Sequence, residues 1–133
     1  METMIRIGDI PLIYKGKDKT GLSYYELAED HIDDDFPGIV VPKGFLTNGA
    51  SVPKYIRGII SPTGNLFRAA VVHDYLYATH QLSRRKSDRV FKKIVYDDTQ
   101  NRLLAYTSYL GIRAVGSSFW NADTKPVLSG LPA

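Results

Sequence analysis

The chain has 133 residues, of which 44% are hydrophobic, 11% aromatic and 23% charged. This length fits one domain, and the composition allows a buried core, so disorder, collagen-like repeats and coiled coils are excluded. The chain contains no cysteine, which excludes a disulfide scaffold, thiol catalysis and cysteine-ligated zinc. Its formal net charge of +3 is too small to identify a partner. No signal peptide or transmembrane segment is expected, since no apolar run approaches about 18 residues.

The first half of the chain is predicted to form strands joined by turns. Short apolar or alternating runs lie at 4–10, 12–15, 23–28, 39–41 and 45–47, separated by segments rich in proline and glycine. The third run also tolerates a helix at its end. The acidic segment from Asp30 to Asp35 lacks the glycine and terminal glutamate of an EF-hand, so we interpret it as a polar loop.

The second half of the chain is predicted to be helical. Helices are expected at 52–60, 66–79, 84–97 and 100–116, with Ser51 and Ser83 as N-caps. Residues 121–133 contain two prolines and are expected to form a loose tail. The prediction is therefore a single α+β domain at 1–120, β-rich over 1–50 and α-rich over 51–118. A small N-terminal antiparallel sheet is followed by a helical half containing an antiparallel helix pair.

A histidine and an aspartate are expected to meet between two of these helices. His73 lies near the middle of the apolar face of its helix, and Asp88 lies at the edge of the apolar face of the next. The short link at 80–82 packs these helices antiparallel, which predicts a buried His73–Asp88 pair. Tyr77, one turn after His73, can donate its hydroxyl to Asp88 or pack beside it. A carboxylate bound to one imidazole nitrogen fixes the tautomer, and the other nitrogen can then act as a general base.

The carboxylate next to the histidine points to another side of the same helix. Asp74 is rotated by about 100° from His73, towards a side where a preceding loop can pass. A carboxylate there can join loop carbonyls around a hard cation such as Ca²⁺. The residues alone equally allow His73, Tyr77 and Asp88 to form a buried polar network that only fixes the helix pair.

Two of these segments resemble the phospholipase A2 superfamily. The run HDYLY at 73–77 resembles its His-Asp-x-x-Tyr helix, and SDRVF at 87–91 resembles its later helix, in which Asp-x-x-Phe follows a small residue. The upstream PTGN at 62–65 resembles the calcium loop of the parvovirus capsid phospholipases, although Thr63 replaces the expected proline or glycine.

The resemblance implies a role for each residue of the site. His73 would activate the attacking water, Asp88 would orient His73, and Tyr77 would complete the catalytic group. Asp74, with Gly64 and Asn65, would bind Ca²⁺, which would polarise the ester carbonyl. The function implied is calcium-dependent hydrolysis of a phospholipid ester.

A second resemblance covers more of the chain, from about Val41 to Trp120. The run FLTNGASVP at 45–53, the helix at 68–77 and the segment at 83–91 are similar to a family of small tailed-phage and prophage proteins of unassigned function. Members usually carry Thr-Asp-Gly-Ala-Ser, so Asn48 stands here in place of an acid. The family implies a phage virion or host cytoplasm as location and other virion proteins as partners. Asn48, Gly49 and Ser51 form either a ligand loop or an ordinary strand-to-helix turn.

Two surface features indicate contacts with partners. The helix at 84–97 has a basic face made of Arg85, Lys86, Arg89, Lys92 and Lys93. Such a face is either solvated or suited to an anionic membrane or an acidic partner, and nucleic acid is not the partner we expect. The last helix has an apolar stripe that includes Leu103, Tyr106 and Leu110, which is either packed or an interface in an oligomer.

Three functions compete on this sequence. The first is the calcium-dependent phospholipid hydrolase. The second is a non-enzymatic virion component, such as a tail or tail-tip protein, in which the helix pair is only a scaffold. The third is an HD-type metal phosphohydrolase, which the strands of the first half and the position of His31 in an acidic loop argue against.

Overall fold

The computed structural model describes residues 3–7, 9–17, 19, 21, 23–47 and 66–121. The strands are β1 (Thr3–Ile7), β2 (Ile10–Lys17), β3 (Ser23–Leu27), β4 (His31–Ile32), β5 (Val40–Val41) and β6 (Leu46–Thr47). The helices are α2 (Phe67–Thr79), α3 (Arg84–Thr99), α4 (Arg102–Val115) and α5 (Ser117–Asn121). The predicted helix at 52–60, the candidate ligands Asn48, Gly49, Ser51, Gly64 and Asn65, and the tail beyond residue 121 lie outside the described residues.

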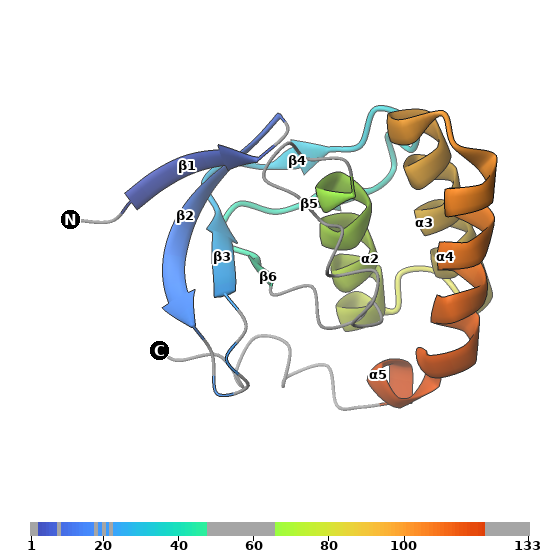
Figure 1. The fold of residues 1–133 in the computed structure, drawn as a ribbon. Helices are drawn as coiled ribbons and strands as arrows, with labels where there is room; N and C mark the ends of the chain where they lie inside the picture. The colour runs from blue at the N-terminus through green and yellow to red at the C-terminus, as the bar shows by residue number, and fades with distance from the viewer. Residues whose placement is uncertain are drawn as a thin grey trace.

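Strands β1, β2, β3 and β6 form an antiparallel sheet in that order, while β4 and β5 pair separately (Figure 1). Strand β2 is longer than predicted, because Pro11 pairs with Arg6 near the start of the strand, where a missing N–H is tolerated. The register shifts next to Gly16, whose φ of 101° suits glycine. The acidic segment was predicted to be a loop throughout, but β4 forms there because His31 and Ile32 pair with β5.

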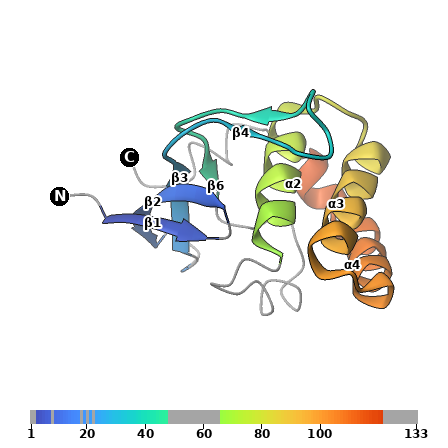
Figure 2. The ribbon, with the colours of Figure 1, turned by 90° about the horizontal axis from the view of Figure 1, so that it is seen from above.

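Helix α2 lies between the sheet and the α3–α4 pair, as Figures 1 and 2 show. Of its 13 residues, 10 are buried, which is the pattern of a helix covered on all sides rather than of a surface helix. The core includes side chains from the sheet, such as Leu12 and Leu27, and from α3, such as Phe91 and Ile94. The predicted order, a small antiparallel sheet followed by a helical half, is confirmed.

The helix boundaries follow from their caps. Ser83 Oγ accepts the N–H of Lys86 at 3.2 Å, as predicted for an N-cap, and α3 continues to Thr99. Asn101 then caps α4, so this helix starts later than the predicted residue 100. The contacts Arg68–Asp98 and His73–Asp88 show that α2 and α3 run antiparallel. Helix α5 was not predicted as a separate element. Among the described residues, no helix is both long and apolar enough to cross a bilayer.

Candidate functional site

Asp88 is contacted by side chains from two neighbouring helices, α2 and α4. Its carboxylate is fully buried on α3. Oδ1 lies 2.8 Å from His73 Nε2 and accepts the hydroxyl of Tyr77 at 2.6 Å, both from α2. Oδ2 accepts Arg113 Nη1 from α4 at 2.8 Å. The predicted His73–Asp88 contact and the Tyr77 hydrogen bond are confirmed, while their catalytic roles stay predictions.

These contacts determine the protonation of the cluster. Burial alone would raise the pKa of Asp88, but the hydrogen bonds from His73, Tyr77 and Arg113 outweigh it and hold that pKa below its ordinary value. Because the carboxylate is therefore ionised at neutral pH, it accepts the contact, and His73 Nε2 carries the proton that faces Asp88. Burial and the charge of Asp88 raise the pKa of Tyr77, so its hydroxyl stays a donor.

The imidazole of His73 is enclosed by aromatic rings. The side chain is 0% exposed, and its ring centre lies 4.1 Å from that of Tyr77 and 5.3 Å from that of Phe91. Trp120, on α5, meets Tyr77 edge to face at 5.2 Å and stacks on His80 at 3.7 Å. Helix α5 therefore covers the C-terminal end of α2, next to the polar cluster.

The end of α4 approaches the cluster closely. Arg84 Nη2 donates to the carbonyl oxygens of Ile112 at 3.2 Å and Arg113 at 2.8 Å, which holds the last turn of α4 beside α3. A Cβ at Gly116 would lie 2.6 Å from the Ile112 oxygen and 2.7 Å from the Tyr77 hydroxyl oxygen. Only glycine leaves room for this approach, which sets where α4 places Arg113.

Asp74 contacts a different part of the fold from His73. It is 3% exposed, and its Oδ2 accepts the hydroxyl of Thr47 at 2.5 Å. Thr47 ends β6 and begins the TNGAS motif, so a preceding segment does pass this side of α2, as expected. Both His73 and Asp74 make further interactions in addition to these contacts.

The described residues supply only part of a calcium site. Asp74 and Thr47 offer two hard oxygen donors side by side, whereas Ca²⁺ takes six to eight oxygen ligands. Within the described ranges, no three histidine or acidic side chains are grouped so that they could hold a metal. Gly64 and Asn65 lie outside those ranges. Ca²⁺ binding and the role of Asp74 as a ligand therefore stay predictions.

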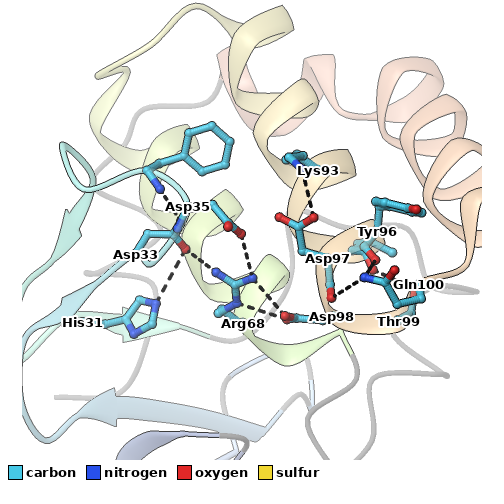
Figure 3. A network of polar contacts seen from close by, with 12 residues as sticks. His31, Asp33, Asp35, Arg68, Lys93, Tyr96, Asp97, Asp98, Thr99 and Gln100 are labelled. Carbon is cyan, nitrogen blue, oxygen red and sulfur yellow. Dashed lines mark hydrogen bonds and ion pairs between the residues drawn. The ribbon is translucent and has the colours of Figure 1, made fainter.

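A second polar cluster surrounds Arg68 near the start of α2 (Figure 3). Its guanidinium donates to Asp33 at 2.8 Å and Asp35 at 3.2 Å in the β4–β5 connection, and to Asp98 at 2.9 Å on α3. Asp33 is 1% exposed and also accepts the backbone N–H of Phe36. The interpretation of the acidic segment as only a polar loop was therefore incomplete, because it anchors the β-rich half to two helices.

The structure shows the exposure of the two predicted surface features, the basic face of α3 and the apolar stripe of α4. On α3, Arg85, Lys86, Arg89 and Lys93 are exposed and Lys92 is half-buried, so the predicted basic face exists. On α4, the stripe with Leu103, Tyr106 and Leu110 is exposed rather than packed. The opposite side of α4 buries Ala105, Ser108 and Ile112.

Sequence reasoning missed two partners of the site. Arg113 was not singled out, although an antiparallel α4 brings its last turn to the level of Asp88 at the start of α3. Thr47 was quoted within a motif but not as a partner of Asp74. A buried carboxylate needs hydrogen-bond donors, and this requirement was the available signal for both residues.

Comparison with known proteins gives a family and no activity. No curated protein matches the chain, and no solved structure matches it. A family model described as "Protein of unknown function (DUF1353)" matches residues 26–112. The match contains Thr47, His73, Asp74 and Asp88 and ends one residue before Arg113. Since the matched segment covers more than half of the chain, the protein belongs to the DUF1353 family.

Proposed function

We propose that this protein is a small ester hydrolase in which His73 is the general base. The observation that supports this proposal best is the contact between His73 Nε2 and Asp88 Oδ1 at 2.8 Å. Asp88 is held in turn by Tyr77 and Arg113, so both the tautomer and the orientation of the imidazole are defined. A phospholipid is the substrate class we propose, on the resemblance of 73–77 and 87–91 to the phospholipase A2 superfamily.

The reaction uses one water molecule. The imidazole of His73 takes a proton from water while the water oxygen attacks the ester carbonyl carbon. The imidazolium, stabilised by the Asp88 carboxylate, then returns this proton to the departing alcohol oxygen, which releases a fatty acid and a lysophospholipid. Tyr77 and Arg113 hold Asp88 in place without touching the substrate.

Calcium and the phage setting belong to the same proposal. Ca²⁺ would polarise the ester carbonyl, with Asp74 and Thr47 among its oxygen ligands, but no step above depends on it. By the second resemblance, the protein would act in a phage particle or in the host cytoplasm, among other virion proteins.

Fatty-acid release from phosphatidylglycerol vesicles tests the proposal. We expect release by the wild type and loss of more than about a hundredfold in His73→Gln, since a positioned general base contributes about 10²- to 10⁴-fold. His31→Gln makes the same change outside the site and should keep the activity. Parallel reactions with Ca²⁺ and with a chelator test the cation. A folded wild type that releases no fatty acid under either condition would overturn the proposal.

A second candidate is a non-enzymatic virion component that uses α2, α3 and α4 as a scaffold. It is favoured by one observation: His73 and Asp88 are both 0% exposed, whereas a general base must be reached by water. In this case the cluster fixes the helix packing and supplies no chemistry.

Stability measurements separate the two candidates. If the cluster is only a scaffold, His73→Ala should lower the free energy of unfolding by about 1–3 kcal/mol, because it leaves a buried carboxylate short of a partner, and the wild type should be inactive. A hydrolase should lose its turnover in this variant even where the protein remains folded.

A further inference from the structure

A pocket of about 300 Å³ opens between α3 and α4, away from the His73 cluster. Its lining consists of Lys92, Lys93, Tyr96, Arg102, Ala105 and Tyr106. The ammonium of Lys92 lies 4.7 Å from the ring centre of Tyr109, and the guanidinium of Arg102 lies 5.7 Å from that of Tyr96. These contacts hold two cations at the wall of the pocket.

Basic side chains outnumber acidic ones around the pocket. Arg85 and Arg89 are exposed on the same side of α3 as Lys92 and Tyr96, one turn apart along the helix. Two acids lie nearby on α3: Asp97, which accepts the ammonium of Lys93 at 3.0 Å, and Asp98, which accepts the guanidinium of Arg68 at 2.9 Å. The sequence of α4 contains no acidic residue. A phosphate group therefore complements the charge of this face.

The α4 side of the same face is apolar. Leu103, Tyr106 and Leu110 are 73%, 54% and 46% exposed, and their spacing places them on one side of the helix. Val115 and Phe119 are also exposed, at 48% and 41%, but Val115 is rotated by more than 100° from this stripe. A row of this kind costs free energy in water unless a partner covers it.

A basic pocket beside an exposed apolar stripe favours one class of anionic partner over others. A nucleic acid or a soluble phosphate would contact the cations but leave Leu103 and Leu110 in water. The surface of an anionic bilayer offers phosphate groups and acyl chains at the same place, and interfacial helices combine these two features. We propose that the α3–α4 face docks onto anionic phospholipid membranes, with a headgroup phosphate in the pocket and Leu103, Tyr106 and Leu110 at the acyl boundary.

Flotation of the full chain with vesicles tests this inference. We expect binding to phosphatidylglycerol vesicles to exceed binding to phosphatidylcholine vesicles, and to weaken as salt rises. The double variant Lys92→Gln, Arg102→Gln should lose about tenfold or more in affinity for the anionic vesicles. The matched control Lys17→Gln, Lys43→Gln removes the same charge elsewhere and should bind within about twofold of the wild type. Leu103→Ser, on the exposed stripe, should also weaken binding.

Several results would overturn the docking surface. One is equal vesicle binding by the pocket variant and its control. Another is tighter binding to a single-stranded oligonucleotide than to the vesicles. A third is a dimer in sedimentation that Leu103→Ser converts to a monomer without an effect on vesicles. His73→Gln should keep full vesicle binding. Vesicle binding therefore tests the docking surface independently of the hydrolase proposal, which is tested by fatty-acid release.

Discussion

Arg113 and Asp88 form an ion pair that joins the last turn of α4 to the first half of α3. The Nη1–Oδ2 distance is 2.8 Å, and the two side chains are 27% and 0% exposed. The other oxygen of Asp88 faces His73 and Tyr77, so Arg113 does not compete with them for hydrogen-bonding positions. It supplies a permanent positive charge to the buried carboxylate.

Replacing Arg113 should therefore destabilise the fold. We expect Arg113→Met to lower the free energy of unfolding by about 1–3 kcal/mol, less than for a fully buried pair because the guanidinium is partly solvated. The measurement is urea unfolding at pH 7. Arg85→Met, at an exposed position on α3, should change the same quantity by less than about 0.5 kcal/mol. Equal effects of the two substitutions would mean that the Asp88 ion pair adds nothing to stability.

The stability of the protein should fall at acid pH. The pKa of Asp88 is lower in the folded than in the unfolded chain, where it is about 3.9, so the unfolded state takes up more protons as the pH falls. The stabilisation that Asp88 provides is complete at pH values above its pKa in the unfolded chain. It is lost as the pH falls through its pKa in the folded protein. Burial would raise the pKa of Asp33, but His31, Arg68 and two backbone N–H groups lower it, so it acts in the same direction.

Urea unfolding at several pH values between 7 and 3 checks this expectation. Asp88→Asn should be less stable than the wild type at pH 7 and should lose less stability on acidification. If the variant and the wild type show parallel pH dependence, Asp88 is not one of the groups responsible. Asp34→Asn, at an exposed position, serves as the control.

The hydroxyl of Thr47 should stabilise the link between β6 and α2. Thr47→Val keeps the shape but removes the donor to Asp74, which is 3% exposed, so we expect a loss of about 1–3 kcal/mol in the free energy of unfolding. Thr107→Val, on the exposed side of α4, is the matched control and should cost less. Calorimetry of both variants gives the comparison, and a fully stable Thr47→Val would show that Asp74 does not depend on this donor.

Gly116 should tolerate no side chain. In Gly116→Ala the new Cβ meets a backbone oxygen and the Tyr77 hydroxyl, so α4 must shift, and we expect a loss of about 1–3 kcal/mol. Gly38→Ala is the control, because a Cβ there meets nothing within 4 Å. Thermal unfolding should show a lower midpoint for the first variant only. An unchanged midpoint in Gly116→Ala would mean that the end of α4 moves without cost.

Sequence patterns predicted the helical half well because its signals are local. Apolar periodicity located α2, α3 and α4 to within two residues at each end, and Ser83 marked one start correctly. The β-rich half was predicted less well. Pro11 was expected to separate two strands but lies inside β2, and β4 was missed because a two-residue strand has no periodicity of its own.

The part of the candidate site that lies between α2 and α3 was predicted from the sequence, and the rest was not. His73, Tyr77 and Asp88 follow from one helix pair, whose antiparallel packing a short link dictates. Arg113 and Thr47 depend on how a third helix and a strand approach that pair, and nothing local in the sequence encodes such distances. The same holds for Arg68, whose three acidic partners come from both halves of the chain.

The position of α2 between the two halves has a consequence for biosynthesis. The β-rich half is translated first, but Leu12 and Leu27 pack in a core that also needs α2, and the Asp33–Arg68 and Thr47–Asp74 contacts reach forward by 35 and 27 residues. In a nascent chain that ends before α2, the sheet side chains that share this core therefore lack the cover that α2 gives them. We therefore expect the β-rich half to complete its folding only after α2 has left the ribosome.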